Sequence, residues 1–392
     1  MRKLKKIYKT SWGVPVMLDF NTLEMFEVTD DYSVQPDARL MLEGLDLDFS
    51  EMVPCAYRIA LTEHCNLRCV DCFVTKNLVT HLVMTPEILE DVIARTITNS
   101  KNLTTPVNYQ FFGGEPLLKF DLIKRAVELL DAAAFRNEIL QPTYSLTTNA
   151  MLVNDEIIDF FKQHNFSVGV SVDGDKDTHN KLRPDPQFND TFSVVRQKYF
   201  AMVDAGINIH VLITPNPAYA DQLVSLAKYI LDEFPMKTFT VNEAFEYDTL
   251  RWTMGSKEHV EALIEITRYA KEKGIETDTV LTPILSAISN ETRRRSACSI
   301  LGKEFLCSVS PDGRFSFCAQ KWVKDFDLNK SQKYLLPEQC KECYALGYCG
   351  GPCPAFRALT GCEVDENRCA FMRAAPAKII ENLDIFLDDE EG

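Results

Sequence analysis

The chain has 392 residues, of which 46% are apolar and 25% are charged, and its formal net charge is −15. This length and apolar content allow a large core and about two or three domains. The negative charge argues against a general nucleic-acid binder, because neutralising phosphates needs a basic face. The basic start of the chain leads into no apolar run of signal-peptide or membrane-span length, so we expect a cytoplasmic protein.

The chain contains thirteen cysteines. In a reducing compartment, cysteines are more often ligands of metals or clusters than partners in disulfide bonds, and an odd number cannot pair completely. We therefore expect cofactor ligands among them, and we disfavour a disulfide framework.

The first part of the chain predicts a small β structure. Residues 14–20 and 24–31 have the pattern of a β-hairpin that turns at Asn21 and Thr22, and a short helix is expected near residues 36–45. We treat residues 1–52 as an N-terminal region separate from the rest of the chain.

Residues 53–288 alternate short β-rich runs with amphipathic helical stretches such as residues 121–135. Six such units in series predict an α/β fold with a parallel sheet, namely a partial (β/α)6 TIM-like barrel. Residues 289–392 are rich in cysteine and poor in long helices, which indicates a small domain held together by metal. The predicted strands are residues 57–62, 107–112, 143–148, 167–173, 207–213 and 237–243.

Chemistry in such a barrel belongs to residues at the carboxyl ends of the strands. The residues with unusual chemistry follow these ends: Cys65 follows the first strand, and the sequence GGEP (residues 113–116) follows the second. Asn149 follows the third strand, while Ser171 and Asp173 close the fourth. The sequence therefore places a candidate site at one end of the barrel.

Three closely spaced cysteines, Cys65, Cys69 and Cys72, have the spacing C-x3-C-x2-C. A structural zinc site normally takes four ligands in two pairs, so zinc is the weaker alternative. Three thiolates on a cubane cluster would leave one iron open to a small molecule. This stretch resembles the radical S-adenosylmethionine (SAM) enzymes, and the sequences GGEP, TTN and SVDG continue the resemblance in the family's order over about residues 55–250.

The resemblance implies a 4Fe-4S cluster on the three cysteines, SAM on the open iron and formation of a 5′-deoxyadenosyl radical. It further implies that Gly113, Gly114 and Glu115 receive the methionyl amino group of SAM. Arg183 resembles an arginine that pairs with the SAM carboxylate, for which its planar fork is suited.

Further positions of the resemblance concern the nucleoside part of SAM. Ser171 and Asp173 look like ribose-contacting residues, and Asn149 is expected either to contact the cofactor or to cap its loop. The family usually carries an aromatic residue directly before the third cysteine, where this chain has Asp71. Phe73 can replace that aromatic residue or belong to the core.

The C-terminal cysteines resemble those of the SPASM domain, an extension that binds two auxiliary 4Fe-4S clusters, which would bring the total to three. The resemblance rests on the spacing C-x2-C-x5-C-x3-C from Cys340 to Cys353 and on Gly313-x4-Cys318. The implied ligands of the inner cluster are Cys298, Cys318 and Cys353, and those of the outer cluster are Cys340, Cys343, Cys349 and Cys369, with Cys362 as the alternative to Cys369.

Cys307 is a candidate fourth ligand of the inner cluster. A two-residue turn at Asp312 and Gly313 would set Cys307 opposite Cys318 on one face of a hairpin, and we favour this register. A three-residue loop would instead turn Cys307 to the other face and leave one iron of the cluster open.

SPASM enzymes mostly modify peptides and proteins, so the resemblance implies a maturase that installs a thioether or carbon crosslink in a ribosomally made precursor peptide by net oxidation. Residues 1–52 weakly resemble the start of a leader-peptide recognition element, which binds leaders by strand addition. A flavodoxin or ferredoxin would supply electrons, and neither nucleic acid nor a membrane is an expected partner.

Two other functions compete with this hypothesis. Anaerobic sulfatase maturases share the architecture, but they carry an acidic residue directly after the cysteine of the G-x4-C hairpin, where this chain has Ala319. A non-catalytic iron–sulfur electron carrier is the alternative from another class, although it would not need GGEP together with an open-site triplet.

Overall fold

One large sheet organises the computed structural model of the protein. The structure describes residues 5–11, 13, 15–19, 23, 25–27, 45–46, 53–72, 74, 81–187, 189–243, 245–246, 251–254, 257–290, 304–316, 318, 333–334, 336–341 and 343–386. The sheet has nine strands in the order β11-β10-β9-β8-β7-β6-β5-β12-β13, and all neighbours are parallel except β12 and β13. In chain order these strands are β5 (Val53–Thr62), β6 (Asn108–Gly113), β7 (Thr143–Thr148), β8 (Ser167–Ser171), β9 (Asn208–Ile213), β10 (Thr238–Val241), β11 (Glu276–Asp278), β12 (Glu304–Val309) and β13 (Phe315–Ser316).

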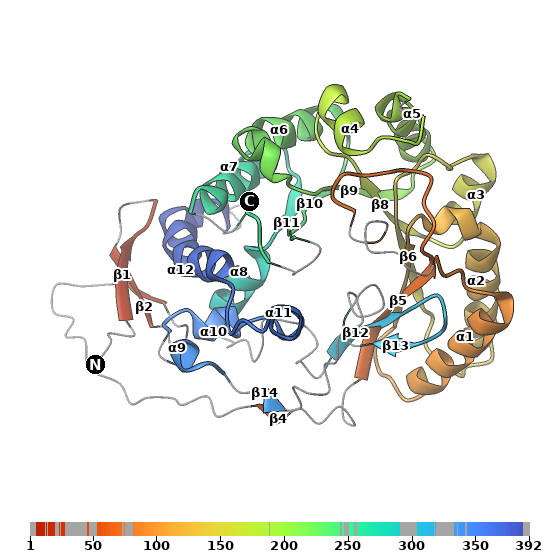
Figure 1. Ribbon diagram of the computed structural model, residues 1–392, viewed down its shortest axis with the longest axis horizontal. Helices are drawn as coiled ribbons and strands as arrows, with labels where there is room; N and C mark the ends of the chain where they lie inside the picture. The colour runs from red at the N-terminus through yellow and green to blue at the C-terminus, as the bar shows by residue number, and fades with distance from the viewer. Residues whose placement is uncertain are drawn as a thin grey trace, which may run out of the picture.

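The sheet curls into an arc, and the helices that connect its strands lie along the outer side (Figure 1). This is the predicted partial barrel, and all six predicted strands are present. The outer helices are α1 (Pro86–Ser100), α2 (Phe120–Phe135), α3 (Asp155–Gln163), α4 (Lys176–Leu182), α5 (Thr191–Asp204), α6 (Leu223–Glu233), α7 (Lys257–Glu272) and α8 (Thr282–Ser289). Single 3-10 turns, η3 (Pro116–Lys119), η4 (Pro217–Gln222) and η7 (Leu383–Ile385), complete the connections.

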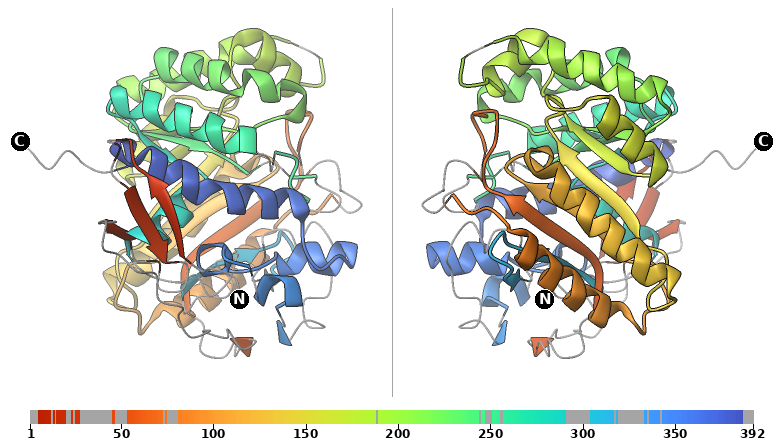
Figure 2. Two further views of the ribbon diagram at one scale, coloured as in Figure 1. Left: turned by 90° about the vertical axis from the view of Figure 1, so that its left-hand side faces the viewer. Right: turned by 90° about the vertical axis from the view of Figure 1, so that its right-hand side faces the viewer.

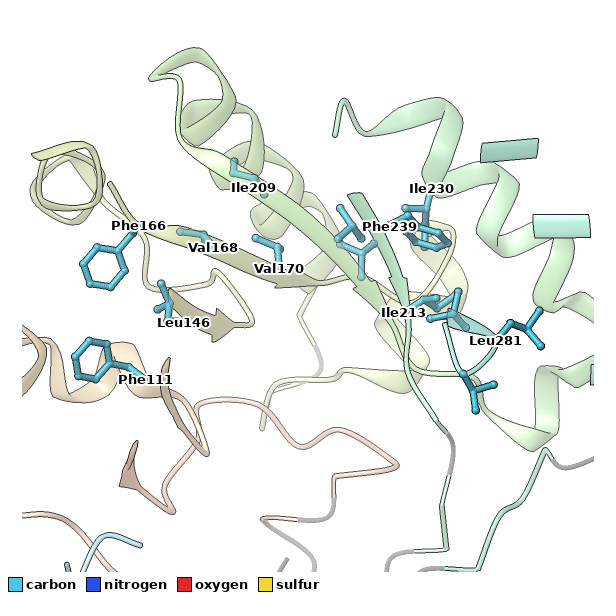
Figure 3. Close-up of a cluster of buried hydrophobic side chains, with 14 of the residues drawn as sticks. Phe111, Leu146, Phe166, Val168, Val170, Ile209, Ile213, Ile230, Phe239 and Leu281 are labelled. Atoms are coloured by element: carbon cyan, nitrogen blue, oxygen red, sulfur yellow. The ribbon is translucent and has the colours of Figure 1, made fainter. Parts of the chain in front are cut away.

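The core lies between the sheet and the outer helices because alternate strand residues are apolar. Along β6 the exposure alternates residue by residue, and the buried Phe111 stacks on Phe166 with ring centroids 6.2 Å apart. Leu146, Val168 and Val170 continue this layer on the next strands (Figure 3). The other residues of each strand face the inside of the arc, where a site can form.

The C-terminal region contributes to the barrel sheet, which differs from the boundary expected near residue 289. Strand β12 pairs in parallel with β5, and Cys307 lies beside Tyr57 in this register. The short helices α9 (Glu338–Lys341), α10 (Leu346–Cys349) and α11 (Pro354–Thr360) precede α12 (Glu366–Glu381), which packs along α7 (Figure 2). None of the described helices is long and apolar enough to cross a membrane.

A separate three-stranded antiparallel sheet forms near the N-terminus from β1 (Lys5–Lys9), β2 (Pro15–Asp19) and β3 (Met25–Glu27). The predicted hairpin is confirmed, since Leu18 pairs with Met25, whereas β1 was not predicted. The buried Leu18 and Leu23 join the main core, and β1 contacts α12. Residues 36–44 of the expected helix lie outside the described residues. Among the described residues, β4 (Leu45–Asp46) pairs with β14 (Lys333–Tyr334).

Candidate iron–sulfur and SAM site

The three cysteines of the first motif lie in the loop that leaves the carboxyl end of β5. The Cys65 sulfur accepts hydrogen bonds from the Leu67 amide at 3.4 Å and from the Asn149 side chain at 3.7 Å. Burial raises the pKa of the Cys65 thiol to about 12 and that of Cys69 to about 11. Cys72 packs beside Ala60 on the inner face of the sheet. The thiols therefore need a nearby positive charge to lose their protons. Cysteines that bind a metal cluster are deprotonated in this way.

The spacing of these sulfurs fits a cluster better than a single ion. In the described part of the chain, no three Cys, His, Asp or Glu side chains are arranged to hold one metal ion. A zinc site would need every sulfur about 2.3 Å from the same ion. A four-iron cluster binds each cysteine through a different iron, so it does not require the sulfurs of Cys65, Cys69 and Cys72 to meet at one ion.

Gly113 and Gly114 let the end of β6 lie directly against the cysteine loop. The Gly114 amide donates to the Thr62 carbonyl at 2.7 Å, and the Glu115 amide donates to the His64 carbonyl at 2.9 Å. A Cβ on Gly114 would lie 2.2 Å from the His64 oxygen, and Gly113 has a φ of +142°. Only glycine fits this approach, so these two residues set the position of the loop that carries Cys65.

Glu115 connects the second and third strand ends through its carboxylate. One oxygen accepts from the Leu117 amide at 3.0 Å and from the Thr148 hydroxyl at 2.8 Å, and the other accepts from the Asn149 amide at 2.9 Å. The side chain is buried, and this burial raises the pKa of Glu115 to about 7. The carboxyl group can therefore change its charge near neutral pH.

Asn149 extends this connection to the cysteine loop. Its side-chain amide donates to the Asn66 side chain at 2.8 Å as well as to the Cys65 sulfur. Its oxygen accepts from the Met151 amide at 3.0 Å, so Asn149 also caps its own loop. Glu115, Asn149 and Cys65, which we predicted as site residues from three separate strand ends, are thus brought together.

Asp173 and Arg183 bind each other, although the sequence suggested separate roles for them at the ribose and the carboxylate of SAM. Arg183 donates from Nε to Asp173 at 2.6 Å and from Nη2 at 3.2 Å, and both side chains are largely buried. The Thr214 amide donates to the same carboxylate at 3.1 Å. The third nitrogen of Arg183 lies 3.9 Å from the Cys69 sulfur. The pair therefore places a fixed positive charge beside a cluster ligand, while Ser171 ends β8 in a partly buried position.

Two buried residues near the site were not predicted from the sequence. His179 is fully buried, and its Nδ1 accepts from the Asp173 amide at 3.3 Å, so it supports the Asp173–Arg183 pair. Asn216 donates to Asp71 from the loop after β9, which ties the cysteine loop to that strand end. Phe73, the proposed replacement for the missing aromatic residue, lies outside the described residues. Histidine and asparagine in loops carry no sequence pattern that would have singled them out.

A second group of cysteines lines one cavity in the C-terminal region. Its walls include the predicted outer-cluster ligands Cys340, Cys343, Cys349 and Cys369, together with Cys353 and Arg368. Cys362 is exposed and does not line this cavity. The geometry therefore favours Cys369 over Cys362 as the last ligand.

Arg368 is a buried cation in this cavity that the sequence did not reveal. It donates from Nη1 to the Cys349 sulfur at 3.3 Å and to the Gly351 carbonyl at 2.7 Å, and from Nη2 to the Cys349 carbonyl at 3.3 Å. Its guanidinium also lies 5.6 Å from the Trp252 ring centroid. A donor and positive charge at this sulfur stabilise a thiolate ligand.

The inner set of cysteines is only partly within the described residues. Cys318 and Cys353 both pack against Ala355, which is consistent with a shared cluster. Cys298 lies outside the described residues, as does Ala319.

The two-residue turn expected before Cys318 is wrong. Ser308 pairs with Ser316 and Val309 with Phe315, and the Ser310 amide donates to the Arg314 carbonyl at 3.0 Å. The loop therefore contains the three residues 311–313, and Cys318 is one residue out of register with Cys307. The Pro-Asp-Gly sequence is itself a signal for this loop, because proline favours the second position of a type I turn and glycine the fourth.

Cys307 consequently lies on the opposite face of the hairpin from Cys318. Its side chain is 5% exposed and belongs to the main core, on the same face of β12 as Val309. This position in the core argues against its predicted role as a metal ligand.

Comparison with known proteins decides the family. Residues 59–199, which include the triplet, Glu115, Asn149 and Arg183, match the family model described as "Radical SAM superfamily". The protein is a radical SAM enzyme. As such it binds SAM on a 4Fe-4S cluster, and the sequence prediction of the family is confirmed.

The radical SAM enzyme is similar to the cysteine-type anaerobic sulfatase-maturating enzyme of Clostridium perfringens. It is 32% identical to the protein of strain 13 over 162 residues, which are 39% of this chain and 42% of the relative. With the protein of strain ATCC 13124 the identity is 25% over 331 residues, 75% of this chain and 86% of the relative. The match at 32% identity thus spans under half of that relative's length.

The fold of the radical SAM enzyme is similar to that of the solved structure described as native anSMEcpe with bound AdoMet and Cp18Cys peptide. The TM-score is 0.67 at 20% sequence identity, and the match covers 83% of this chain and 97% of the other. The likeness therefore extends beyond the barrel into the cysteine-rich region.

We expect Gly114→Ala to displace the cysteine loop. The added Cβ would collide with the His64 backbone, so SAM cleavage should fall by about 100-fold, as after a misplacement of roughly 1 Å at a reacting centre. Gly206→Ala is the matched control, because Gly206 also has a positive φ but its Cβ would meet open space. The measurement is SAM cleavage per folded protein, and equal activity in both variants would contradict the role of Gly114.

We expect Cys369→Ala to lower the iron and sulfide content of the purified protein, and Cys362→Ala to leave it unchanged. The reason is that Cys369 lines the cavity with Cys340, Cys343 and Cys349, whereas Cys362 is exposed. Cys307→Ala is a control for a buried cysteine outside any cluster and should also retain full iron. Loss of iron in Cys362→Ala with full iron in Cys369→Ala would reverse the assignment.

Proposed function

We propose that this radical SAM enzyme reductively cleaves SAM to a 5′-deoxyadenosyl radical and oxidatively modifies a ribosomally synthesised precursor peptide by a thioether or carbon crosslink. The observation that carries the proposal is the presence of two cysteine centres in one chain. One lies at the strand ends beside Glu115 and Asn149, and the other lines the C-terminal cavity. A solved structure of similar fold is described with a bound peptide, which supports a peptide substrate.

The chain's own residues would bind and orient SAM, which supplies the radical chemistry when bound to its cluster. Glu115, with Gly113 and Gly114, would receive the methionyl ammonium group. Arg183, held by Asp173, would face the SAM carboxylate. The positions of Ser171, Asp173 and Asn149 at adjacent strand ends support their roles in holding the nucleoside part.

The C-terminal cysteines would hold two auxiliary clusters that accept the electron released when a substrate radical closes a ring. The outer cluster would use Cys340, Cys343, Cys349 and Cys369. The inner cluster would use Cys298, Cys318 and Cys353. Because Cys307 faces the core, this second set leaves one iron open, where a substrate thiolate could bind before thioether formation. A flavodoxin or ferredoxin would reduce the first cluster.

Sulfatase maturation is the second candidate, because the curated Clostridium perfringens relatives at 32% and 25% identity carry that name. Ala319 stands directly after Cys318, where the sulfatase maturases carry an acidic residue as the proposed base. This difference favours crosslinking. The electron-carrier alternative does not fit a radical SAM enzyme.

The N-terminal sheet is proposed as the place where a leader segment of the precursor binds. Strand β3 is an edge of this sheet, and an extended peptide can add to such an edge through backbone hydrogen bonds. Strand β1, the other edge, lies against α12. The exposed Met25 on β3 would contact the added strand.

SAM affinity should fall as the pH drops through about 7, because Glu115 has its pKa raised to about 7 by burial. Below that pH the carboxyl group is protonated, and it loses its attraction for the methionyl ammonium. At pH 8, Glu115→Gln should weaken SAM binding by about 1.5–3 kcal/mol and should flatten the pH dependence. The measurement is calorimetric titration of SAM into the iron-loaded protein, and an identical pH profile for the variant would place the titration elsewhere.

The proposed function is tested with the short peptide encoded by the reading frame beside this gene. Iron-loaded enzyme, SAM and reductant should release 5′-deoxyadenosine and a peptide lighter by two hydrogen atoms, with a crosslink located by tandem mass spectrometry. The same peptide should slow hydrogen exchange at Met25–Glu27. Formylglycine in a sulfatase-derived peptide, without any crosslinked precursor, would instead establish sulfatase maturation.

A further inference from the structure

A row of polar side chains crosses the inner face of the barrel on three neighbouring strands. Arg58 on β5 lies beside Gln110 on β6 and beside Ser308 on β12 at the same level of the sheet. Their chain neighbours Tyr57, Ile59, Cys307 and Val309 belong to the core under the outer helices. Since successive strand residues point to opposite faces, Arg58, Gln110 and Ser308 point into the arc.

The positive charge of Arg58 has few compensating contacts. Its Nε donates to the Gln110 oxygen at 2.6 Å, and its guanidinium carbon lies 5.2 Å from the Phe112 ring centroid. Among the described residues, no carboxylate forms an ion pair with it, and its two terminal nitrogens have no acceptor. Burial lowers the pKa of Arg58 for the same reason. Arg58 is only partly exposed, and a cation that loses solvation without gaining an anion is costly, so its retention inside the barrel requires a cause.

Ser308 provides an independent observation at the same place. Its side chain is 1% exposed, and its hydroxyl has no hydrogen-bond partner within the described structure. A buried polar group in this state costs about 1–3 kcal/mol relative to a satisfied one. Gln110 uses its oxygen for Arg58, which leaves its amide hydrogens for another acceptor. Arg58, Gln110 and Ser308 can each donate a hydrogen bond, and Ser308 can also accept one.

Hydrogen-bond donors arranged in this way are suited to a carboxylate. The planar fork of an arginine binds both oxygens of a carboxylate, and a hydroxyl and an amide can donate to the same oxygens. Gln110 lies three residues before Gly113, which is about 10 Å along the strand from the proposed position of the methionyl group. A group bound at Arg58 would thus lie deeper in the barrel than SAM.

We infer that Arg58, Gln110 and Ser308 form a subsite for a carboxylate of the peptide substrate, either an acidic side chain or the C-terminal carboxylate. This inference rests on the proposed peptide-modifying function and adds a substrate preference to it. The subsite would hold the peptide at a fixed depth, so that one residue is presented to the radical at the strand ends.

The test uses three acetylated pools of mixed-sequence octapeptides with the iron-loaded enzyme and SAM, without reductant. One pool has a fixed central glutamate and an amidated end, the second has glutamine and an amidated end, and the third has glutamine and a free C-terminal carboxylate. Equilibrium dialysis with mass spectrometry measures binding. The wild-type enzyme should bind the glutamate pool or the free-acid pool about tenfold more tightly than the neutral pool, and the preferred pool identifies the source of the carboxylate.

Variants assign the preference to the subsite. Arg58→Gln should abolish it, Ser308→Ala should reduce it several-fold while keeping the core shape, and Arg58→Lys should keep part of it. Arg95→Gln is the matched control, because Arg95 contacts the Phe315 ring from α1, on the outer face of the same sheet. Equal binding of all pools, or a preference that persists in both Arg58→Gln and Ser308→Ala, would overturn the inference.

Two further readouts keep this test separate from that of the proposed function. If Arg58→Gln weakens SAM binding but leaves the preference between peptide pools unchanged, Arg58 belongs to the SAM carboxylate. That result would also overturn the peptide subsite. SAM cleavage and peptide modification by the wild-type enzyme are measured independently of the pools. Failure of that reaction refutes the proposed function, whereas failure of pool discrimination refutes only the subsite.

Discussion

The close approach of two backbones at the end of the barrel determines how the rest of the site is built. Gly114 lies against the His64 carbonyl, and the Gly114 and Glu115 amides donate to the chain that leads into the cysteine loop. This contact fixes the cysteine loop relative to β6, and the buried Glu115 then fixes β6 relative to the third strand end. These contacts join three strand ends into one surface, on which a cofactor can bind.

The charges around this surface are arranged to serve negatively charged ligand atoms. Arg183 is anchored by Asp173 on one side and faces a cysteine sulfur on the other. Arg368 repeats this arrangement in the C-terminal cavity, where it bonds to the Cys349 sulfur and to backbone carbonyls. In both places a buried guanidinium lies beside a cysteine sulfur, and surroundings of this kind set the reduction potential of a cluster that the sulfur binds.

Much of the barrel could be predicted from the sequence, because its strands are short apolar runs between amphipathic helices and its cysteine triplet has a specific spacing. The partner of β5 on its other side could not, since β12 is about 250 residues away in the chain and no local pattern specifies that pairing. The register before Cys318 was missed because the Asp-Gly pair outweighed Pro311, although the proline and glycine together favour the longer loop. The pairing of Asp173 with Arg183 depends on side-chain directions that strand and motif patterns do not contain.

The addition of β12 to the sheet also determines how the cysteine centres are connected. Strand β5 leads to Cys65, and its neighbour β12 leads through β13 to Cys318, so both cysteines follow strands of one hydrogen-bonded sheet. A ladder of backbone hydrogen bonds is far stiffer than a linker between domains. The separation between the first cysteine site and the hairpin that carries Cys318 is therefore a property of the sheet, and domain motion cannot alter it. An electron that tunnels between them would cross a gap of constant width, whatever peptide occupies the barrel.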